Sequence, residues 1–284
     1  MSHNARYTRR HLLGMGATGL AATLIGACGA EQTKETIMVT ADKRQESTSQ
    51  RDERYFSEAR LQARPTRLKS PAKAIPHGLH KLGLGPGRDG LIYVPSNYRA
   101  DQPAPLVLML HGAGGQARNG LNPLYNLADK FGLILLAVDS RGRTWDIILG
   151  DYGPDVAFIN RALAHTFEHY AIDPKRIAIE GFSDGASYSL SLGLSNGDLF
   201  SHVIAFSPGF MAPTQQEGAP HLFISHGKKD GVLPIDRCSR TIVPRLRRAR
   251  YELRYREFDG PHTVPPEIAR EAMHWFTSKP VAGK

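Results

Sequence analysis

The chain has 284 residues and a formal net charge of +9, with 41% hydrophobic and 22% charged residues. These proportions are typical of a globular protein and allow one large α/β domain or two small ones. The charge does not indicate a nucleic-acid partner, because residues 1–27 hold three arginines and no acid, which leaves +6, and no RNA-binding or zinc-finger signature is present. The two cysteines are Cys28 and Cys238, and only Cys238 lies in the part expected to fold, so an internal disulfide is excluded there.

The N-terminal segment has the features of an export signal. Arg9 and Arg10 precede an apolar, Gly- and Ala-rich stretch that is shorter than the ~20 residues needed to span a bilayer. This arrangement resembles a bacterial twin-arginine signal, and the Ile-Gly-Ala-Cys sequence at 25–28 resembles a lipobox, in which the cysteine receives lipid and becomes the new N-terminus. We expect residues 1–27 to be removed and Cys28 to anchor the protein in the bacterial cell envelope, on a periplasmic or extracellular face. The alternative is an ordinary signal peptide with an incidental cysteine.

Residues 28–76 are predicted to form a flexible tether behind the lipidated cysteine. They are polar, charged and poor in large apolar side chains, so they cannot bury enough surface to offset the entropy of ordering. From about His77, short apolar runs alternate with helical periodicity. We therefore place the folded domain at residues 77–284.

The domain is predicted to alternate strands with helices. The runs PLVLMLHG and LILLAVDS are continuously apolar, as expected of parallel strands buried on both faces. Alternation of such strands with helices indicates one α/β domain with a mostly parallel sheet. Strands are expected at 78–85, 89–95, 105–112, 133–140, 176–181, 202–209, 220–227 and 251–258, and helices at 121–132, 154–171, 183–196, 235–250 and 265–278.

The Gly-Phe-Ser-Asp-Gly sequence at 181–185 carries the first candidate site residue. It follows the apolar strand RIAIEG and precedes a predicted helix, which is the context of a nucleophile elbow. In such a turn, Gly181 and Gly185 leave room where a Cβ atom would clash. The turn presents the Ser183 hydroxyl at the carboxyl end of the strand, where α/β sheets bind ligands. We therefore predict that Ser183 is a nucleophile.

A serine nucleophile needs a base, and the base needs an acid that orients it. Asp230 follows the strand PHLFIS and His262 follows the strand YELRYREF, so the three residues occur in the order Ser, Asp, His that accompanies such an elbow. Asp259 is a rival acid. It lies only three residues from His262 on the same loop, however, and would approach the imidazole poorly.

A glycine-rich loop completes the candidate site. The sequence His-Gly-Ala-Gly-Gly at 111–115 follows the third predicted strand, where glycines such as Gly112 let the backbone approach the nucleophile. We predict that the N–H groups of Ala113 and Asp184 bind the oxyanion of a tetrahedral intermediate. Loss of one such donor typically costs on the order of 10²–10³ in rate.

The motifs HGAGG, GFSDG, HGKKD and FDGPH, in this order and spacing, resemble the α/β-hydrolase superfamily. The sequence is most similar in character to phospholipase/carboxylesterases, feruloyl esterases and polyhydroxybutyrate-depolymerase-like proteins, over roughly residues 78–278. The resemblance implies the α/β-hydrolase fold, with helices on both faces of the sheet and no large lid. It also implies a carboxylic ester hydrolase that forms an acyl-enzyme on a small-molecule or polymer ester, with no metal or organic cofactor.

Other functions are compatible with the same residues. A peptidase or a thioesterase would use the same fold and triad, and a non-catalytic envelope lipoprotein would use the fold to bind a partner. His165 and His169, in the sequence HTFEH, fit a zinc-peptidase pattern, but the helix is needed to pack on the sheet and no third ligand is evident. The natural substrate and the oligomeric state are not determined by the sequence.

Four further features are interpreted structurally. Trp145, in the loop after the strand LILLAVD, either lines the substrate pocket or anchors that loop by packing. The sequence GPGRDG at 85–90 matches a dinucleotide-binding pattern but precedes a strand, so we interpret it as a hairpin turn. Asp155 is expected to cap a helix or to interact with the helix dipole, and Cys238 to be a buried or half-buried helical residue.

Overall fold

The computed structural model describes residues 56, 58–66 and 76–278. The predicted signal at 1–27, the lipidation site Cys28 and most of the predicted tether lie outside the described residues. Within the ranges that are described, no helix is long and apolar enough to cross a membrane.

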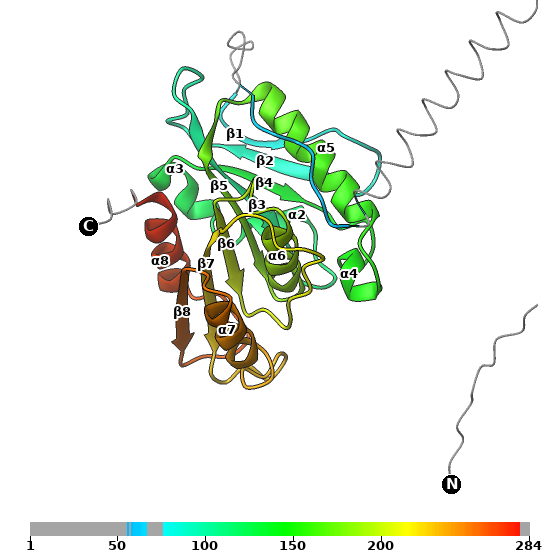
Figure 1. Ribbon diagram of the computed structural model, residues 1–284. Helices are drawn as coiled ribbons and strands as arrows, with labels where there is room; N and C mark the ends of the chain where they lie inside the picture. Colours follow the sequence, from blue (N-terminus) through cyan, green and yellow to red (C-terminus); the bar gives the residue numbers. More distant parts are fainter. Residues whose placement is uncertain (1–55, 57, 67–75, 279–284) are drawn as a thin grey trace, which may run out of the picture. The chain divides into compact units, whose positions relative to one another are not determined.

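An eight-stranded sheet forms the centre of the domain (Figure 1). The strands lie in the order β1-β2-β4-β3-β5-β6-β7-β8. Strand β2 is antiparallel to β1 and β4, and all other neighbouring pairs are parallel, as the sequence predicted. The strands are β1 (Gly78–Lys81), β2 (Gly90–Val94), β3 (Ala104–Leu110), β4 (Ile134–Val138), β5 (Ile172–Phe182), β6 (His202–Phe206), β7 (His221–Gly227) and β8 (Leu253–Phe258).

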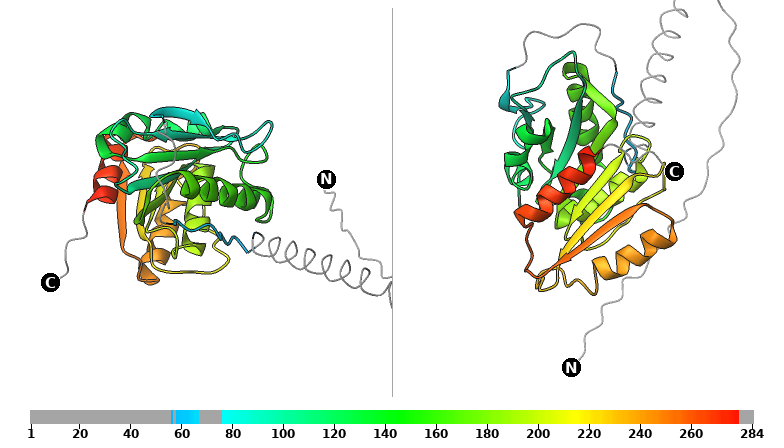
Figure 2. Two further views of the ribbon diagram at one scale, coloured as in Figure 1. Left: turned by 90° about the horizontal axis from the view of Figure 1, so that it is seen from above. Right: turned by 90° about the vertical axis from the view of Figure 1, so that its left-hand side faces the viewer.

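Helices cover both faces of this sheet (Figure 2). One apolar cluster joins the sheet to α5, α6 and α7, and the other joins it to α2, α3 and α8. Every residue of β3 and β4 is buried, because crossover connections place helices on both sides of central parallel strands. The helices are α2 (Ala117–Leu121), the 3₁₀ helix η1 (Tyr125–Leu127), α3 (Ala128–Phe131), α4 (Asp146–Leu149), α5 (Pro154–His169), α6 (Asp184–Ser195), α7 (Ser239–Arg248) and α8 (Pro266–Thr277).

Some details differ from the predicted elements. The range 121–132, expected as a single helix, holds only the last residue of α2 together with η1 and α3, and residues 117–120 of α2 were not predicted to be helical. Pro123, two residues after the end of α2, has no N–H to continue the helical hydrogen bonds, which accounts for the interruption. The short helix α4 was not predicted, because four residues are too few to show helical periodicity.

Strand β8 is an edge strand of the sheet and alternates between half-buried and exposed positions over most of its length. Arg254 and Arg256 occupy exposed positions and both pair with Glu271 of α8, at 3.5 and 3.0 Å. The solvent-facing side of this edge therefore carries charge rather than apolar surface.

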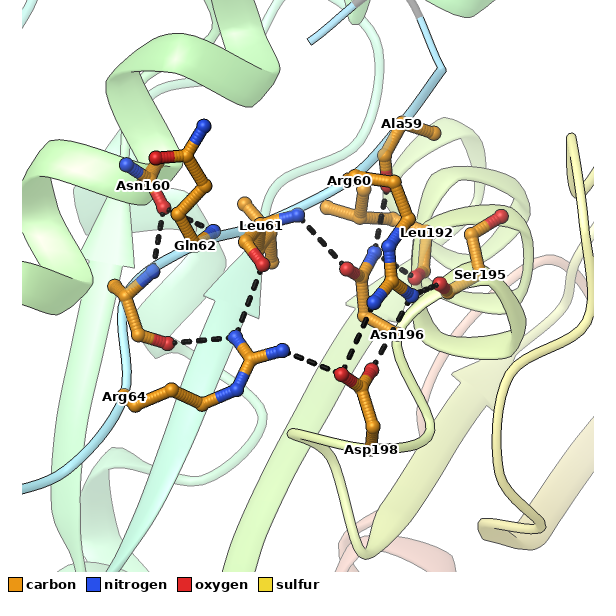
Figure 3. A network of polar contacts seen from close by, with 11 residues as sticks. Ala59, Arg60, Leu61, Gln62, Arg64, Asn160, Leu192, Ser195, Asn196 and Asp198 are labelled. Carbon is orange, nitrogen blue, oxygen red and sulfur yellow. Dashed lines mark hydrogen bonds and ion pairs between the residues drawn. The ribbon is translucent and has the colours of Figure 1, made fainter. Parts of the chain in front are cut away.

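A segment before the predicted domain boundary packs against the domain (Figure 3). We call residues 58–66 the strap. Ala59 and Leu61 are at most 1% exposed and Ala63 is 8% exposed, so alternate side chains of the strap point into the protein. The structure thus departs from the tether predicted over 28–76. A composition averaged over that whole range conceals the short period-two pattern of the strap.

Candidate active site

Ser183 occupies a strained turn between β5 and α6. Strand β5 ends at Phe182 and α6 begins at Asp184, which leaves Ser183 between them. Its φ of 58° and ψ of −119° form a conformation that costs about 1–3 kcal/mol for a residue other than glycine. The Ser183 N–H donates to the carbonyl of Phe206 at the end of β6, at 3.0 Å, which helps to hold the turn. This is the geometry of a nucleophile elbow.

The two glycines of the elbow are required by close backbone contacts. A Cβ atom on Gly181 would lie 2.2 Å from the carbonyl oxygen of Gly185. A Cβ atom on Gly185 would lie 2.2 Å from the carbonyl oxygen of Leu110, at the end of β3. Neither position accepts a side chain without displacing the backbone, so the first turn of α6 packs closely against the ends of β5 and β3.

Asp230 and His262 meet at the carboxyl ends of β7 and β8. These strands pair in parallel, so the loops that follow them lie at the same edge of the sheet. Nδ1 of His262 lies 2.5 Å from Oδ2 of Asp230. The rival acid Asp259 is 71% exposed and pairs instead with Nζ of Lys229, at 2.9 Å. Asp230 is therefore the carboxylate that contacts the imidazole.

The surroundings of Asp230 keep its carboxylate ionised. Its Oδ1 accepts hydrogen bonds from the N–H groups of Val232 and Leu233, at 2.9 and 2.8 Å. Burial alone would raise the pKa of Asp230, but the hydrogen bonds from His262 and from these two amides outweigh burial and hold the pKa below its ordinary value. An ionised carboxylate holds the proton on Nδ1 of the imidazole and leaves Nε2 free to accept another.

His226, in β7, supports this acid and was missed by the sequence analysis. Its Nε2 lies 2.8 Å from the carbonyl oxygen of Leu233 and 3.2 Å from Oδ2 of Asp230, and its Nδ1 lies 2.7 Å from Oγ of Ser239. Burial lowers the pKa of His226, which favours a neutral ring that donates from Nε2. The residue lies in the motif HGKKD, so the signal was present, but no role had been assigned to it.

A cleft of about 560 Å³ opens beside the elbow. The ring of Phe182 lies 4.6 Å from the ring of His262, measured between centroids, so the imidazole sits next to the residue that precedes Ser183. The cleft is lined by residues that include Gly112, Ala113, Asn119, Asn122, Phe182 and His262.

The oxyanion loop, residues 111–115, runs past the nucleophile. A Cβ atom on Gly112 would lie 3.5 Å from Cβ of Ser183. In the described part of the chain, the N–H groups of Ala113 and Asp184 have no backbone acceptor. The N–H of Asp184 also belongs to the first turn of α6, where the helix dipole favours negative charge. Both amides are thus available to a ligand.

His111 and Trp145 support the oxyanion loop from behind. Burial lowers the pKa of His111, whose Nδ1 donates to the carbonyl of Gly112 at 2.7 Å and whose Nε2 accepts from the N–H of Ser140 at 3.0 Å. Trp145 is 0% exposed, donates from Nε1 to the carbonyl of His111 at 2.8 Å and stacks on Tyr188. Of the two interpretations of Trp145, the structure favours the packing anchor, because a side chain without exposure does not line the cleft.

Arg88 reaches the same loop from the turn between β1 and β2. Its Nη2 donates to the carbonyl of Gly115 at 2.9 Å and to Oγ of Ser140 at 3.2 Å, and its Nε donates to the carbonyl of Ser140. The pattern GPGRDG does form a hairpin turn, as predicted. The glycines of this pattern predict the turn, whereas nothing in the pattern indicates that Arg88 contacts the oxyanion loop.

Glu180 is a second buried acid near the nucleophile and was also missed. It lies on β5, is 0% exposed, and its two carboxylate oxygens have no hydrogen-bond partner among the described residues. Burial raises the pKa of Glu180 well above its ordinary value. Burial therefore favours the neutral form of this carboxyl group.

The remaining candidates lie apart from this site or support its loops. His165 and His169 stack on α5 with ring centroids 4.2 Å apart, and no group of three or more His, Cys, Asp or Glu residues in the described ranges is placed to hold a metal ion. Cys238 is buried directly before α7, rather than inside a helix as predicted, because that helix begins one residue later.

Asp155 does not cap α5 through its side chain, but it lies in the first turn of that helix, where a carboxylate faces the positive end of the dipole. Its carboxylate accepts hydrogen bonds from the N–H groups of Arg141, in the preceding loop, and of Asp146, the first residue of α4. Burial raises its pKa to about 6. Asp155 therefore ties the loop that carries Trp145 to the start of α5.

The chain is similar to known esterases in sequence. Residues 157–274 match the family described as Phospholipase/Carboxylesterase. A probable feruloyl esterase C from Aspergillus oryzae is 30% identical over 168 residues, which cover 56% of this chain and 60% of that protein. The chain thus spans less than two thirds of the length of this relative.

Solved structures show the same fold. A ferulic acid esterase from Anaeromyces mucronatus has a TM-score of 0.54 at 19% identity and covers 77% of this chain and 98% of its own. A fluorophosphonate-binding serine hydrolase from Staphylococcus aureus has a TM-score of 0.59 at 13% identity and covers 72% of this chain and 100% of its own.

The sheet topology and these structural neighbours show the α/β-hydrolase fold, so the fold predicted from the four motifs is confirmed. Within that superfamily, the chain is similar to the phospholipase/carboxylesterases and to the feruloyl esterases.

Proposed function

We propose that the protein is a serine carboxylic ester hydrolase. The observation that carries the proposal is the hydrogen bond between Asp230 and His262 beside the strained Ser183. An ionised acid, an oriented imidazole and a serine on an elbow are the parts that acyl transfer to serine needs. Similarity to esterases supports the same reaction class.

The reaction begins with attack of Ser183 Oγ on the ester carbonyl carbon, while Nε2 of His262 takes the hydroxyl proton. The carbonyl oxygen becomes an oxyanion that accepts hydrogen bonds from the N–H groups of Ala113 and Asp184. When the intermediate collapses, the ester C–O bond breaks and the imidazolium gives its proton to the leaving alcohol. Asp230 stabilises the positive imidazolium throughout this step.

Water completes the cycle by the same route in reverse. It attacks the acyl-enzyme carbonyl while Nε2 of His262 takes a proton, and the second tetrahedral intermediate uses the same two amides. Its collapse releases the carboxylic acid and returns the proton to Ser183 Oγ. His262 is thus the protein group that takes up and returns the proton in both half-reactions.

The substrate proposal is an ester whose acid part enters the cleft beside Phe182, as a small molecule or as a group displayed on a polymer. The names of the feruloyl esterase relatives support an aromatic acyl group. We also propose that export and lipidation at Cys28 place the enzyme in the bacterial envelope, which rests on the sequence motif alone.

The test compares the wild type with Ser183→Ala and with Ser96→Ala, a matched control at an exposed serine. Each protein is treated with a fluorophosphonate probe and with p-nitrophenyl and feruloyl esters. Labelling and turnover by the wild type and the control, and neither by Ser183→Ala, would support the proposal. A folded wild type that neither labels nor turns over any ester would contradict it and favour a binding lipoprotein.

A further inference from the structure

One asparagine at the end of α6 binds the backbone of the strap (Figure 3). Oδ1 of Asn196 accepts a hydrogen bond from the N–H of Leu61 at 2.8 Å. Its Nδ2 donates to the carbonyls of Ala59 and Leu192, at 2.7 and 2.8 Å. The Asn196 side chain is fully buried and bridges the strap to α6, so its hydrogen-bonding capacity depends on the strap being present.

A second asparagine, on α5, binds the strap from the other side. Oδ1 of Asn160 accepts from two successive amides of the strap, Gln62 at 2.8 Å and Ala63 at 2.9 Å. Asn160 and Asn196 together form hydrogen bonds with the backbone of an extended segment. The buried side chains of the strap occupy every second position of that segment. The surface between α5 and α6 is therefore shaped for an extended peptide, and we call it the strap groove.

Ion pairs determine which residues of the strap lie opposite which residues of the strap groove. Asp198, just after α6, pairs with Arg60 at 3.0 Å and also with Arg64. The Arg60 side chain is only 13% exposed, and its guanidinium also donates to the carbonyl of Ser195. Two guanidinium groups on one carboxylate favour a basic segment with arginines four residues apart.

The strap also contacts the loop that follows β6. Oγ1 of Thr214 donates to the carbonyl of Glu58 at 2.5 Å. The N–H of Thr214 lies 3.3 Å from Oγ of Ser195, and the N–H of Ala212 lies 2.9 Å from Oγ of Ser191, both on α6. We call residues 207–214 the β6 loop. Its C-terminal half is therefore held between α6 and the strap.

The N-terminal half of the β6 loop contacts the turn that holds Asp230. The N–H of Gly209 donates to Oγ of Ser187 at 2.9 Å. A Cβ atom on Gly209 would lie 3.3 Å from Cδ2 of Leu233, so the loop packs directly on that residue. Leu233 is one of the two residues whose N–H groups hold Asp230. A continuous set of contacts therefore joins the strap to the turn of the catalytic acid.

We propose that the strap groove is an interaction surface for an extended basic segment, that its occupant is the strap of the same chain, and that its occupation holds the β6 loop in place behind Asp230. The strap is then a positioning element of the enzyme and not part of a passive linker. Its effect on turnover rests on the proposed ester hydrolysis, whereas docking itself does not.

The test uses the full chain with the double substitution Arg60→Ala and Arg64→Ala. The matched control is Arg99→Ala, which also removes an arginine–aspartate pair but at an exposed position away from the groove. Hydrogen exchange is followed by mass spectrometry, together with kcat and KM for a p-nitrophenyl ester. We expect amides of the strap and of the β6 loop to exchange about 5- to 30-fold faster in the double variant. We expect kcat to fall with little change in KM, and the control to match the wild type.

A second set of variants reverses the charges of the arginine–aspartate pairs instead of removing them. Arg60→Asp and Arg64→Asp are combined with Asp198→Arg, which should restore slow exchange relative to either change alone. Unchanged exchange of the strap in the double alanine variant would overturn docking. Faster exchange of the strap alone, with loop exchange and kcat equal to the control, would overturn the positioning role. If both exchange changes occur but no ester is hydrolysed by any protein, docking is supported and the proposed reaction fails instead.

Discussion

The two ends of helix α6 differ in backbone strain and in whether nearby buried polar groups form hydrogen bonds. At the N-terminal end, Ser183 has a strained backbone, and Glu180 just before it is buried without a hydrogen-bond partner in the described part of the chain. At the C-terminal end, Asn196 forms hydrogen bonds with the strap and with α6 itself. Strain and unpaired groups thus lie at the end that carries the proposed chemistry, while the other end supplies stability.

The largest expected effect comes from Ser183→Ala at the strained end. Removal of the nucleophile should lower kcat on the order of 10⁶-fold, with little loss of stability. Ester hydrolysis and a thermal melt measure the two quantities. A variant that keeps a substantial part of the wild-type kcat would exclude Ser183 as the nucleophile.

The second-largest expected loss of kcat comes from substitution of Asp230. Asp230→Asn should lower kcat about 10⁴-fold, because the amide no longer holds the imidazole in the productive tautomer. Asp259→Asn is the matched control, since that carboxylate is exposed and paired with Lys229. Equal losses in the two variants would mean that the structure has assigned the wrong acid.

Arg88→Met tests the support of the oxyanion loop. Loss of the hydrogen bonds to Gly115 and Ser140 should let the loop shift, and kcat should fall by up to about 10²-fold with KM nearly unchanged. Arg88→Lys keeps the charge but not the planar fork, so it should recover only part of the rate. A higher KM at unchanged kcat would show that Arg88 acts on substrate binding instead.

At the other end of α6, Leu61→Ala should act on stability. Leu61 is 1% exposed, and truncation of such a side chain costs about 2–5 kcal/mol in unfolding free energy. Urea denaturation measures the loss. Leu149→Ala, at a leucine that is 71% exposed, should stay within about 0.5 kcal/mol of the wild type. Similar stability of the two variants would show that the strap is not docked in solution.

The smallest effect is a pH dependence that arises from Glu180. Burial raises its pKa well above the ordinary carboxyl value, so at pH values between the unfolded-state and folded-state pKa the folded state keeps a proton that the unfolded state has lost. The contribution of this group therefore destabilises the fold as pH rises, with a limiting slope of about 1.4 kcal/mol per pH unit. Glu180→Gln should remove that slope. Denaturation midpoints of the two proteins between pH 5 and 7 should diverge as pH rises, and parallel curves would argue against a neutral Glu180.

Much of the fold and part of the site could be predicted because their signals are local. Central strands such as β3 and β4 are continuous apolar runs, and Ser183, Asp230 and His262 each follow a strand directly. Because parallel strands end at one edge of a sheet, position along the chain is enough to bring such residues together.

The supporting residues could not be predicted in this way. Arg88 depends on contacts between segments far apart in the sequence, and no spacing rule links it to Ser140. His226 contacts nearby residues, but the pattern of its motif does not show that its ring faces Asp230. The strap was missed for a different reason. Its contacts include backbone hydrogen bonds to asparagines and three buried side chains at alternate positions, which leave little mark on the composition of the whole range.

The charged edge of the sheet affects how neighbouring copies of the protein associate. An exposed edge strand is a template on which a second chain can add its own strand, and this is how many β proteins aggregate. On β8, Arg254 and Arg256 stand at the open edge and pair with Glu271 beside it. A copy that approached edge to edge would have to bury like charges against each other. Many copies held close together on one surface would therefore stay separate instead of joining into a fibre.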